Sequence, residues 1–434
     1  MKKMNKFDLC FIGAGPATVT ALFRLIEKGY GGKIVVIEKG KRIEARPTTE
    51  VINGFGGAGT YSDGKLSSSL NVGGNIPNLS SKDLHKFEKY ILEMYNHFLG
   101  ENEKLAWQQT TSFDTTPSNL TWDSHKTCHM GTERTRGLFL KLEEFFEHCL
   151  NIYFLFEKEV KDVFELTSGE YEVVLDKEPT WLVADKVILA TGQKNLLPSI
   201  LINKFDLKST PRAFQIGVRV EDTINEQYQN IIKANYDFKF VKEYNYDNGV
   251  KVRVRTFCCN SGNAHTCAEK ASEGFTCFNG HALKEPDPNN HTVNYGIMCE
   301  VEGLENYNTK EEQIELMKKV NSLTSWEYDN FDEEGNTNPK RLLLGGFKHL
   351  IGLYPDEVIK SMTDFVWELN KVVDLSNAHY LYPETKLSGN IPELNYSTFE
   401  TKQPNLYMIG DCAISRGIVK SSYTGWKFAE ELNG

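Results

Sequence analysis

Apolar and polar residues in the first forty positions are arranged in a way that predicts a strand, a helix and a second strand. The apolar run 7–12 ends at the glycine-containing turn 13–16, and apolar residues then recur at helical spacing up to Ile26. A second apolar run, 34–37, has the length and composition of a buried strand and ends at Glu38. The chain therefore begins with a strand–turn–helix–strand unit that ends in an acidic residue.

This unit has the features of a dinucleotide-binding turn. Gly13 permits the tight turn, Gly15 lets the backbone approach a pyrophosphate, and the helix N-terminus supplies N–H groups and partial positive charge. Glu38 stands where a carboxylate can accept both ribose hydroxyls of an adenosine. Thr18 replaces the third glycine of the usual motif, so we expect the helix to lie slightly farther from the strand.

Three later segments indicate which dinucleotide is bound. Residues 54–66 form a glycine-rich loop, residues 185–192 read as a buried strand ending in Ala-Thr-Gly, and residues 405–411 read as a strand ending in Gly-Asp. Together they resemble the two-domain FAD oxidoreductases built like glutathione reductase. The resemblance implies FAD as cofactor, and we expect non-covalent binding because no flavinylation motif is present; Cys412 is the one plausible attachment point.

A narrower resemblance extends over nearly the whole chain, in order. Six blocks are similar to those of a bacterial family of FAD-dependent dehydrogenases, most of which have no assigned substrate. Two positions depart from that family: Lys386 replaces an expected arginine, and Gly410-Asp411-Cys412 replaces Gly-Glu. The blocks are 54–66, 129–136, 216–221, 256–262, 275–281 and 382–388.

The resemblance also implies which residues contact FAD. They lie in the first turn, after the second strand, in the glycine-rich loop, in the Ala-Thr-Gly turn, and at the C-terminal strand and helix. The expected cofactor-binding residues are Gly13, Gly15, Pro16, Ala17, Glu38, Lys39, Arg46, Gly57, Ala58, Gly59, Ser62, Asp63, Lys65, Val160, Ala190, Thr191, Gly192, Gly410, Asp411, Gly417, Ile418 and Val419.

The order of predicted elements indicates an α/β protein with one domain inserted into another. We expect a Rossmann-like FAD-binding domain with a parallel sheet and a β-meander, formed by 1–75, 125–200 and 382–434. Residues 201–381 are expected to form a substrate domain on a mainly antiparallel sheet. Residues 76–124 read as a helical and irregular insertion, which would suit a lid.

Composition and charge limit the partners. The 434 residues carry a net charge of −10, which argues against a nucleic-acid surface, and no apolar run is long enough to span a bilayer. The lysines before the first apolar run imitate a signal peptide, but that run is short and already forms the first strand, so we expect a cytoplasmic protein. The expected partner is a small-molecule substrate, and the sequence does not indicate an oligomeric state.

Nine cysteines and the absence of a secretory segment favour free thiols. No C-x-x-C is present, so a redox disulfide of the glutathione reductase kind is not expected. Cysteines and histidines crowd between Cys258 and His281, but their spacing fits no zinc motif, and we expect no metal. Buried cysteines in a sheet are the main interpretation; the alternative is that Cys258 faces the flavin.

Three residues are candidates for catalysis. Arg219 alternates with valines in a predicted strand, so it either faces solvent or binds an anionic group of the substrate. Lys386 has the same two interpretations. Glu384 either accepts a proton or is an exposed loop carboxylate.

The leading functional interpretation is an FAD-dependent dehydrogenase or reductase that transfers a hydride between flavin N5 and a small organic substrate. If Arg219 or Lys386 lies in the active site, its positive charge would favour an anionic substrate. No second nucleotide motif is found, which disfavours a pyridine-nucleotide disulfide reductase. NAD(P)H remains a candidate transient reductant, because docking on the flavin needs no Rossmann motif of its own. One alternative is an NAD(P)H-using flavin monooxygenase, and another is a non-catalytic flavoprotein acting as a sensor or scaffold.

Overall fold

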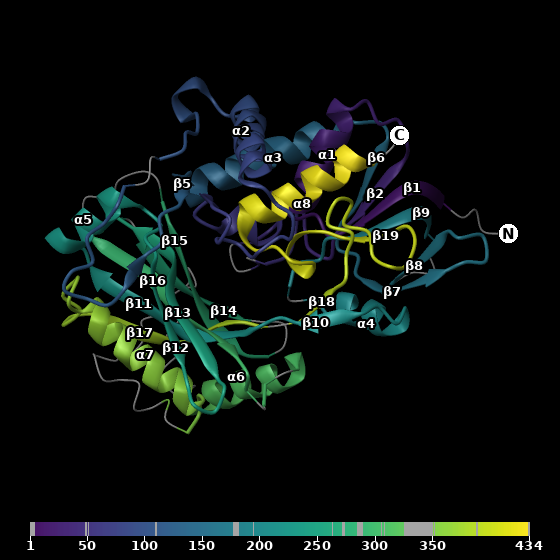
Figure 1. The fold of residues 1–434 in the computed structure, drawn as a ribbon. Coiled ribbons are helices and arrows are strands. Elements are labelled where there is room, and N and C mark those ends of the chain that lie inside the picture. The colour runs from purple at the N-terminus through teal and green to yellow at the C-terminus, as the bar shows by residue number, and fades with distance from the viewer. Residues whose placement is uncertain are drawn as a thin grey trace. The chain divides into compact units, whose positions relative to one another are not determined.

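The computed structural model describes residues 5–432, apart from 48–49, 51, 109–110, 177–181, 194, 263, 271–273, 284–289, 305, 308, 325–349, 351 and 388. The chain divides into two compact units (Figure 1). The first unit consists of Met1–Ala106, Arg134–Thr210 and Gly389–Gly434, and the second consists of Trp107–Glu133 and Pro211–Ser388.

The first unit is built on a sheet whose central strands are parallel. Its strand order is β6-β2-β1-β9-β8-β7, and β19 also pairs with β9. The pairs β1–β2, β1–β9, β2–β6 and β9–β19 are parallel, whereas β7–β8 and β8–β9 are antiparallel and form the expected β-meander. The strands are β1 (Asn5–Ile12), β2 (Ile34–Ile37), β6 (Ile152–Leu155), β7 (Val160–Glu165), β8 (Tyr171–Leu175), β9 (Leu182–Leu189) and β19 (Leu406–Met408).

Helices α1 and α8 pack tightly against each other in this unit (Figure 1). A Cβ atom added at Gly425 would lie 1.9 Å from the carbonyl oxygen of Ala17, so only glycine allows this approach. The helices of the unit are α1 (Pro16–Glu27), α2 (Ser81–Phe98), α3 (Thr132–Glu147), α4 (Leu197–Lys204) and α8 (Gly417–Glu431), with the 3₁₀ turns η1 (Gly57–Tyr61), η2 (Glu101–Glu103) and η5 (Gly410–Cys412) and strand β3 (Lys65–Ser68).

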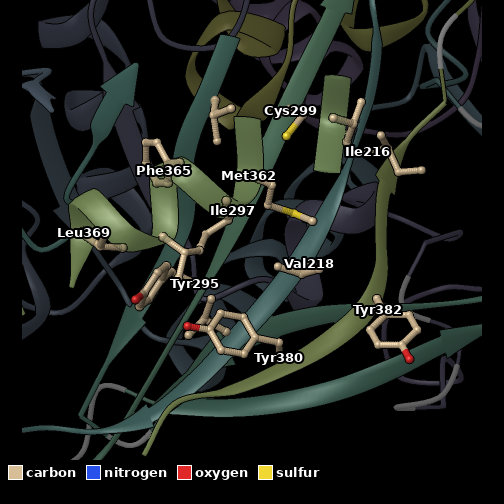
Figure 2. Packing of buried hydrophobic residues seen from close by; sticks show 14 of the residues in the cluster. Ile216, Val218, Tyr295, Ile297, Cys299, Met362, Phe365, Leu369, Tyr380 and Tyr382 are labelled. Carbon is tan, nitrogen blue, oxygen red and sulfur yellow. The ribbon is translucent and has the colours of Figure 1, made fainter. Parts of the chain in front are cut away.

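The second unit is built on an antiparallel sheet of order β17-β11-β16-β13-β12-β4. Helix α7 covers it with Met362, Phe365 and Leu369, which pack with Ile216 and Ile297 in one hydrophobic cluster (Figure 2). The elements are β4 (Thr121–Trp122), β5 (Lys126–His129), β11 (Phe214–Thr223), α5 (Glu226–Ala234), β12 (Phe240–Asn245), β13 (Lys251–Ser261), β14 (Ala264–Lys270), β15 (Thr276–Ala282), β16 (Thr292–Glu302), α6 (Lys310–Thr324), α7 (Asp356–Leu369) and β17 (His379–Lys386). Where the chain passes between units, β10 (Ser209–Pro211) pairs with β18 (Asn390–Pro392).

The fold class expected from the sequence is therefore confirmed: a parallel sheet with a β-meander, and a separate antiparallel sheet. The limits of the units differ from the expected ranges. Helix α2 belongs to the first unit because Phe87 packs against Tyr423 and Trp426 of α8, at ring-centroid distances of 5.5 and 5.6 Å. Residues 107–124 join the second unit, where β4 pairs with β12, and 382–386 join it because β17 pairs with β11 up to Lys386.

None of the helices in the described ranges is long and apolar enough to cross a membrane.

Candidate functional site

The first turn of the chain lies at the carboxyl edge of the parallel sheet. Gly13 has φ +102°, and a Cβ there would lie 2.5 Å from the carbonyl oxygen of Ala190. Gly15, which precedes α1, has no heavy atom within 4 Å of an added Cβ, so the space over the helix N-terminus is open to a ligand. The hydroxyl of Thr18 donates to the Gly13 carbonyl at 2.7 Å. Threonine at the third motif position therefore stabilises the turn.

Glu38 binds the backbone of three segments. Its Oε2 accepts from the N–H of Ala14, and its Oε1 accepts from the N–H groups of Gly40 and Gly54, each at 2.9 Å. A carboxylate has about four acceptor directions. The backbone therefore takes three of these directions, and the binding of ribose hydroxyls by Glu38 stays a prediction. Lys39, directly after Glu38, is partly exposed.

The glycine-rich loop is fastened to the first turn. The N–H of Gly56 donates to the Ala14 carbonyl at 2.8 Å, and a Cβ at Gly57 would lie 3.3 Å from the Cα of Gly15. Arg46 donates to the carbonyls of Phe55 and Gly57, at 3.1 and 3.0 Å, so it holds the loop in shape. Burial lowers the pKa of Arg46 to about 10, which leaves it protonated at neutral pH.

The end of this loop contains a buried ion pair. Lys65 Nζ lies 3.2 Å from Asp63 Oδ2, and both side chains are almost fully buried. Ser62 donates to the Gly59 carbonyl at 2.7 Å, whereas Ala58 is exposed. The turn-stabilising role of this segment is thus evident in its hydrogen bonds, and its contact with a flavin stays a prediction.

Two further turns end at the same sheet edge. Parallel pairing places Met408 at the end of β19 opposite Leu189 at the end of β9. The turns that follow these strands, 190–192 and 410–411, therefore begin next to each other. A Cβ at Gly410 would lie 3.2 Å from the Cβ of Ala17, so this turn also approaches α1. Asp411 is partly exposed, as are Thr191 and Gly192, and Val160 is buried at the start of β7.

These parts form what we term the sheet-edge cluster. It joins segments from both ends of the chain at the carboxyl edge of one parallel sheet, where open α/β sheets bind ligands. The cluster consists of 13–17, 38–39, 54–66, 190–192, 410–411 and the start of α8 at 417–419.

The three catalytic candidates lie in the second unit. Arg219 is fully buried, and its Nη2 lies 2.9 Å from Oε2 of Glu384, which is itself buried. Its Nη1 donates to the Cys258 carbonyl at 3.0 Å. The interpretation of Arg219 as a solvent-facing residue and of Glu384 as an exposed loop carboxylate is therefore wrong. Strands β11 and β17 pair, and this pairing brings the two buried side chains together. Lys386 Nζ lies 4.4 Å from the ring centroid of Phe257.

The Cys258–His281 segment belongs to the same unit. Cys259 and Cys277 are buried, and all nine cysteines are free. Cys258 has φ +51° at an irregularity in the pairing of β13 with β16, which leaves it partly exposed. In the described part of the chain, no group of three or more His, Cys, Asp or Glu side chains has a metal-binding arrangement.

The second unit contains a buried polar network that the sequence did not indicate. Asp237 Oδ2 lies 2.6 Å from Lys239 Nζ and 3.1 Å from His125 Nε2. His125 stands 112 positions from Asp237, so no local spacing could have indicated the contact. The N–H of Cys259 donates to the other oxygen of Asp237 at 3.2 Å, which ties the network to β13.

The chain matches no protein-family model and no curated protein sequence. It is similar to solved structures at low identity. These include PqsL, a probable FAD-dependent monooxygenase from Pseudomonas aeruginosa (11% identity, 98% of this chain and 84% of that chain, TM-score 0.41), and glycine oxidase from Geobacillus kaustophilus (12%, 99% and 96%, TM-score 0.42). A flavoprotein/dehydrogenase from Cytophaga hutchinsonii is also similar (10%, 98% and 77%, TM-score 0.42). Because these values are low, we base the function of the chain on its own residues.

Proposed function

We propose that this chain is an FAD-dependent oxidoreductase and that the sheet-edge cluster holds the cofactor without a covalent bond. The observation that carries the proposal is the open space at Gly15. There a helix N-terminus, a glycine loop and a buried carboxylate meet at the carboxyl edge of a parallel sheet. A glycine turn also occurs in βαβ units that bind no nucleotide, but this combination suits a dinucleotide pyrophosphate and its ribose.

Each part of the cluster has a role in this proposal. The N–H groups at the start of α1 would bind the pyrophosphate, and the remaining acceptor direction of Glu38 Oε2 would receive one ribose hydroxyl. Arg46 and Glu38 keep the glycine loop against the turn through hydrogen bonds to its backbone. FAD, when bound, supplies two-electron chemistry as hydride transfer at N5.

The finer activity that we propose is a dehydrogenase or reductase acting on a small organic substrate. Arg219, Glu384 and Lys386 in the second unit are candidates for substrate recognition. Glu384 neutralises the charge of Arg219, so an anionic substrate group would have to compete with this carboxylate for the arginine. NAD(P)H is a candidate source of electrons.

A substitution at Gly15 tests the cofactor site. The φ of Gly15 is −74° and an added Cβ meets no protein atom, so Gly15→Ala should leave the fold intact. The methyl group would nevertheless occupy the space expected for the pyrophosphate. Gly31→Ala is the matched control, because it also meets nothing within 4 Å and lies in the loop after α1.

The purified chain should be yellow, and the apoprotein should bind FAD. Gly15→Ala should lower the FAD affinity at least about tenfold, which corresponds to the free energy of roughly one good hydrogen bond. Gly31→Ala should bind as the unsubstituted chain does. Anaerobic bleaching of the flavin by NAD(P)H or by a panel of small organic acids would then identify the electron donor. Failure of the unsubstituted chain to bind FAD would refute the proposal, as would equal affinity in the two variants.

A further inference from the structure

Two buried asparagines in the second unit lie between the antiparallel sheet and the hairpin of β14 and β15. Asn260 of β13 and Asn294 of β16 stand directly opposite each other, and both side chains are fully buried. We term them the asparagine pair. A Cβ atom at Gly280 of β15 would lie 2.0 Å from Asn294 Oδ1 and 2.6 Å from Asn260 Nδ2, so the backbone of the hairpin covers the two amide groups and only glycine permits this approach.

The hydrogen bonds around the asparagine pair determine which atom of each amide is oxygen and which is nitrogen. Asn260 Nδ2 donates to the Cys258 carbonyl at 2.9 Å and to Asn294 Oδ1 at 2.8 Å. Asn294 Oδ1 also accepts from Arg219 Nη1, at 3.4 Å. Turning either amide by 180° would place oxygen against oxygen at Asn260, or nitrogen against nitrogen at Asn294, so both orientations are set.

These bonds leave one polar atom of each amide unused. Asn260 Oδ1 and Asn294 Nδ2 are both buried, and neither has a hydrogen-bond partner among the residues that the structure describes. Because the oxygen and nitrogen of an amide share one carbon atom, the bond within the asparagine pair keeps the unused acceptor and the unused donor near each other. Native structures rarely keep such groups without a partner, so these two atoms indicate a bound molecule.

A third polar group on the hairpin faces the asparagine pair. Thr266 of β14 stands opposite Gly280, and residues opposite each other in an antiparallel pair project from the same face. Thr266 Oγ1 therefore lies on the face of the hairpin that covers the amides. It too is buried and has no hydrogen-bond partner within the described ranges. A hydroxyl group both donates and accepts, so it can complete either kind of bond.

The chemistry of these three atoms identifies the class of ligand. An amide donor, an amide acceptor and a hydroxyl group are all uncharged, so they suit a neutral molecule that donates and accepts at once. The charge of the neighbouring Arg219 is balanced by Glu384 at 2.9 Å, which leaves no net charge for an ion. All three atoms are closed to solvent, so the molecule must be small enough to be enclosed. Water meets both conditions, and buried waters make about three hydrogen bonds to groups of this kind.

We propose that an internal water molecule bridges the asparagine pair and Thr266. The water accepts from Asn294 Nδ2 and donates to Asn260 Oδ1, and Thr266 Oγ1 is its third partner. It holds the Asn294 amide with its oxygen toward Arg219, so the water is a structural part of the polar layer that contains the Arg219–Glu384 pair. All of these residues belong to the second unit, so the proposal is independent of FAD binding.

A crystal structure of the full-length chain, at a resolution that shows ordered water molecules, tests the inference. We expect density for one water about 2.7–3.2 Å from both Asn294 Nδ2 and Asn260 Oδ1. A protein atom hydrogen-bonded to either of these two atoms would overturn the proposal, and so would the lack of density between them.

Two variants of Thr266 and a control test its part in holding the water. Thr266→Val keeps the shape of the side chain and removes the hydroxyl group, whereas Thr266→Ser keeps the hydroxyl group. Magnetic relaxation dispersion of the water nuclei counts long-lived internal waters, and the Val variant should lose one that the Ser variant retains. Thr223→Val on β11 is the control and should lose none, because Thr223 is exposed.

An unchanged count in Thr266→Val would overturn the contact with Thr266, and an equal loss in Thr223→Val would show that the change does not come from this site. If the Thr266 variants do not fold, the crystal structure of the unsubstituted chain decides the proposal by itself.

Discussion

Substitution of Glu38 gives the sharpest test of the cofactor site, because its carboxylate binds three backbone segments at once. Glu38→Ala leaves the N–H groups of Ala14, Gly40 and Gly54 without their acceptor. A buried donor left unsatisfied costs about 1–3 kcal/mol, and water entering the vacated space would replace part of the loss. We therefore expect the free energy of unfolding of the apoprotein to fall by at least about 3 kcal/mol.

Glu38→Gln should be milder, and it separates the structural role from the ligand role. The amide oxygen can replace Oε1 and keep the bonds from Gly40 and Gly54, whereas the amide nitrogen would face the N–H of Ala14. One lost bond costs roughly 1–3 kcal/mol of stability. In the proposed site the free acceptor direction of Oε2 receives a ribose hydroxyl, and in Glu38→Gln this atom becomes a donor. FAD affinity should therefore fall at least about tenfold, the equivalent of a charge-assisted hydrogen bond.

Urea unfolding of the apoproteins, followed by circular dichroism, measures the first effect, and quenching of flavin fluorescence measures the second. Glu44→Ala is the control, since Glu44 is an exposed acid in the same segment. Glu38→Ala should lose more free energy of unfolding than Glu38→Gln, and Glu44→Ala should lose almost none. A Gln variant that loses stability but binds FAD as tightly as the control would refute the ribose contact, and equal stability in all three would refute the structural role.

Three further predictions follow from buried groups. Acid precipitation should release all the FAD into the supernatant, because Cys412 is buried and its thiol lies 3.3 Å from the Leu189 carbonyl; a yellow pellet would contradict this. Arg219→Met and Glu384→Gln should each lower the free energy of unfolding by about 3–5 kcal/mol, whereas the double change should cost less than their sum; additive losses in urea unfolding would show that the pair is not coupled. Between pH 8 and 10.5 the apoprotein should become more stable as pH rises, because unfolded Lys420 binds a proton that the folded side chain has lost; the same rise in Lys420→Met would refute this origin.

The start of the fold was predictable because its signals are local. The expected strand 7–12, helix and strand 34–37 correspond to β1, α1 and β2 within two residues at either end. Hydrophobic period, turn glycines and strand length all lie within forty positions, so no distant contact was needed to interpret them. The antiparallel character of the second sheet was predictable for the same reason.

Contacts between distant segments were not predictable from one sequence. Arg219 alternates with valines, which fits an exposed side chain equally well, and its partner Glu384 lies 165 positions later. The unit limits were misplaced because pairing of β17 with β11 and of β4 with β12 is decided by the sheet and not by local composition. The burial of Lys420 was not predictable because a lysine in a helix is ordinarily exposed, and it depends on contacts with Leu70 and Gly74, which lie about 350 positions earlier.

The two buried cations Arg219 and Lys420 differ in a way that bears on where negative charge is recognised. Arg219 shares its charge with Glu384 at 2.9 Å, so an anionic substrate would have to displace a buried carboxylate. Removing one partner from such a pair costs about 3–5 kcal/mol, which would cancel most of the gain from the new contact. Lys420 has no carboxylate partner among the described residues, and its Nζ instead donates to the carbonyls of Leu70 and Gly74. Arg219 and Glu384 therefore form a neutral unit that orders the antiparallel sheet, whereas Lys420 ties residues 70–74 to the start of α8.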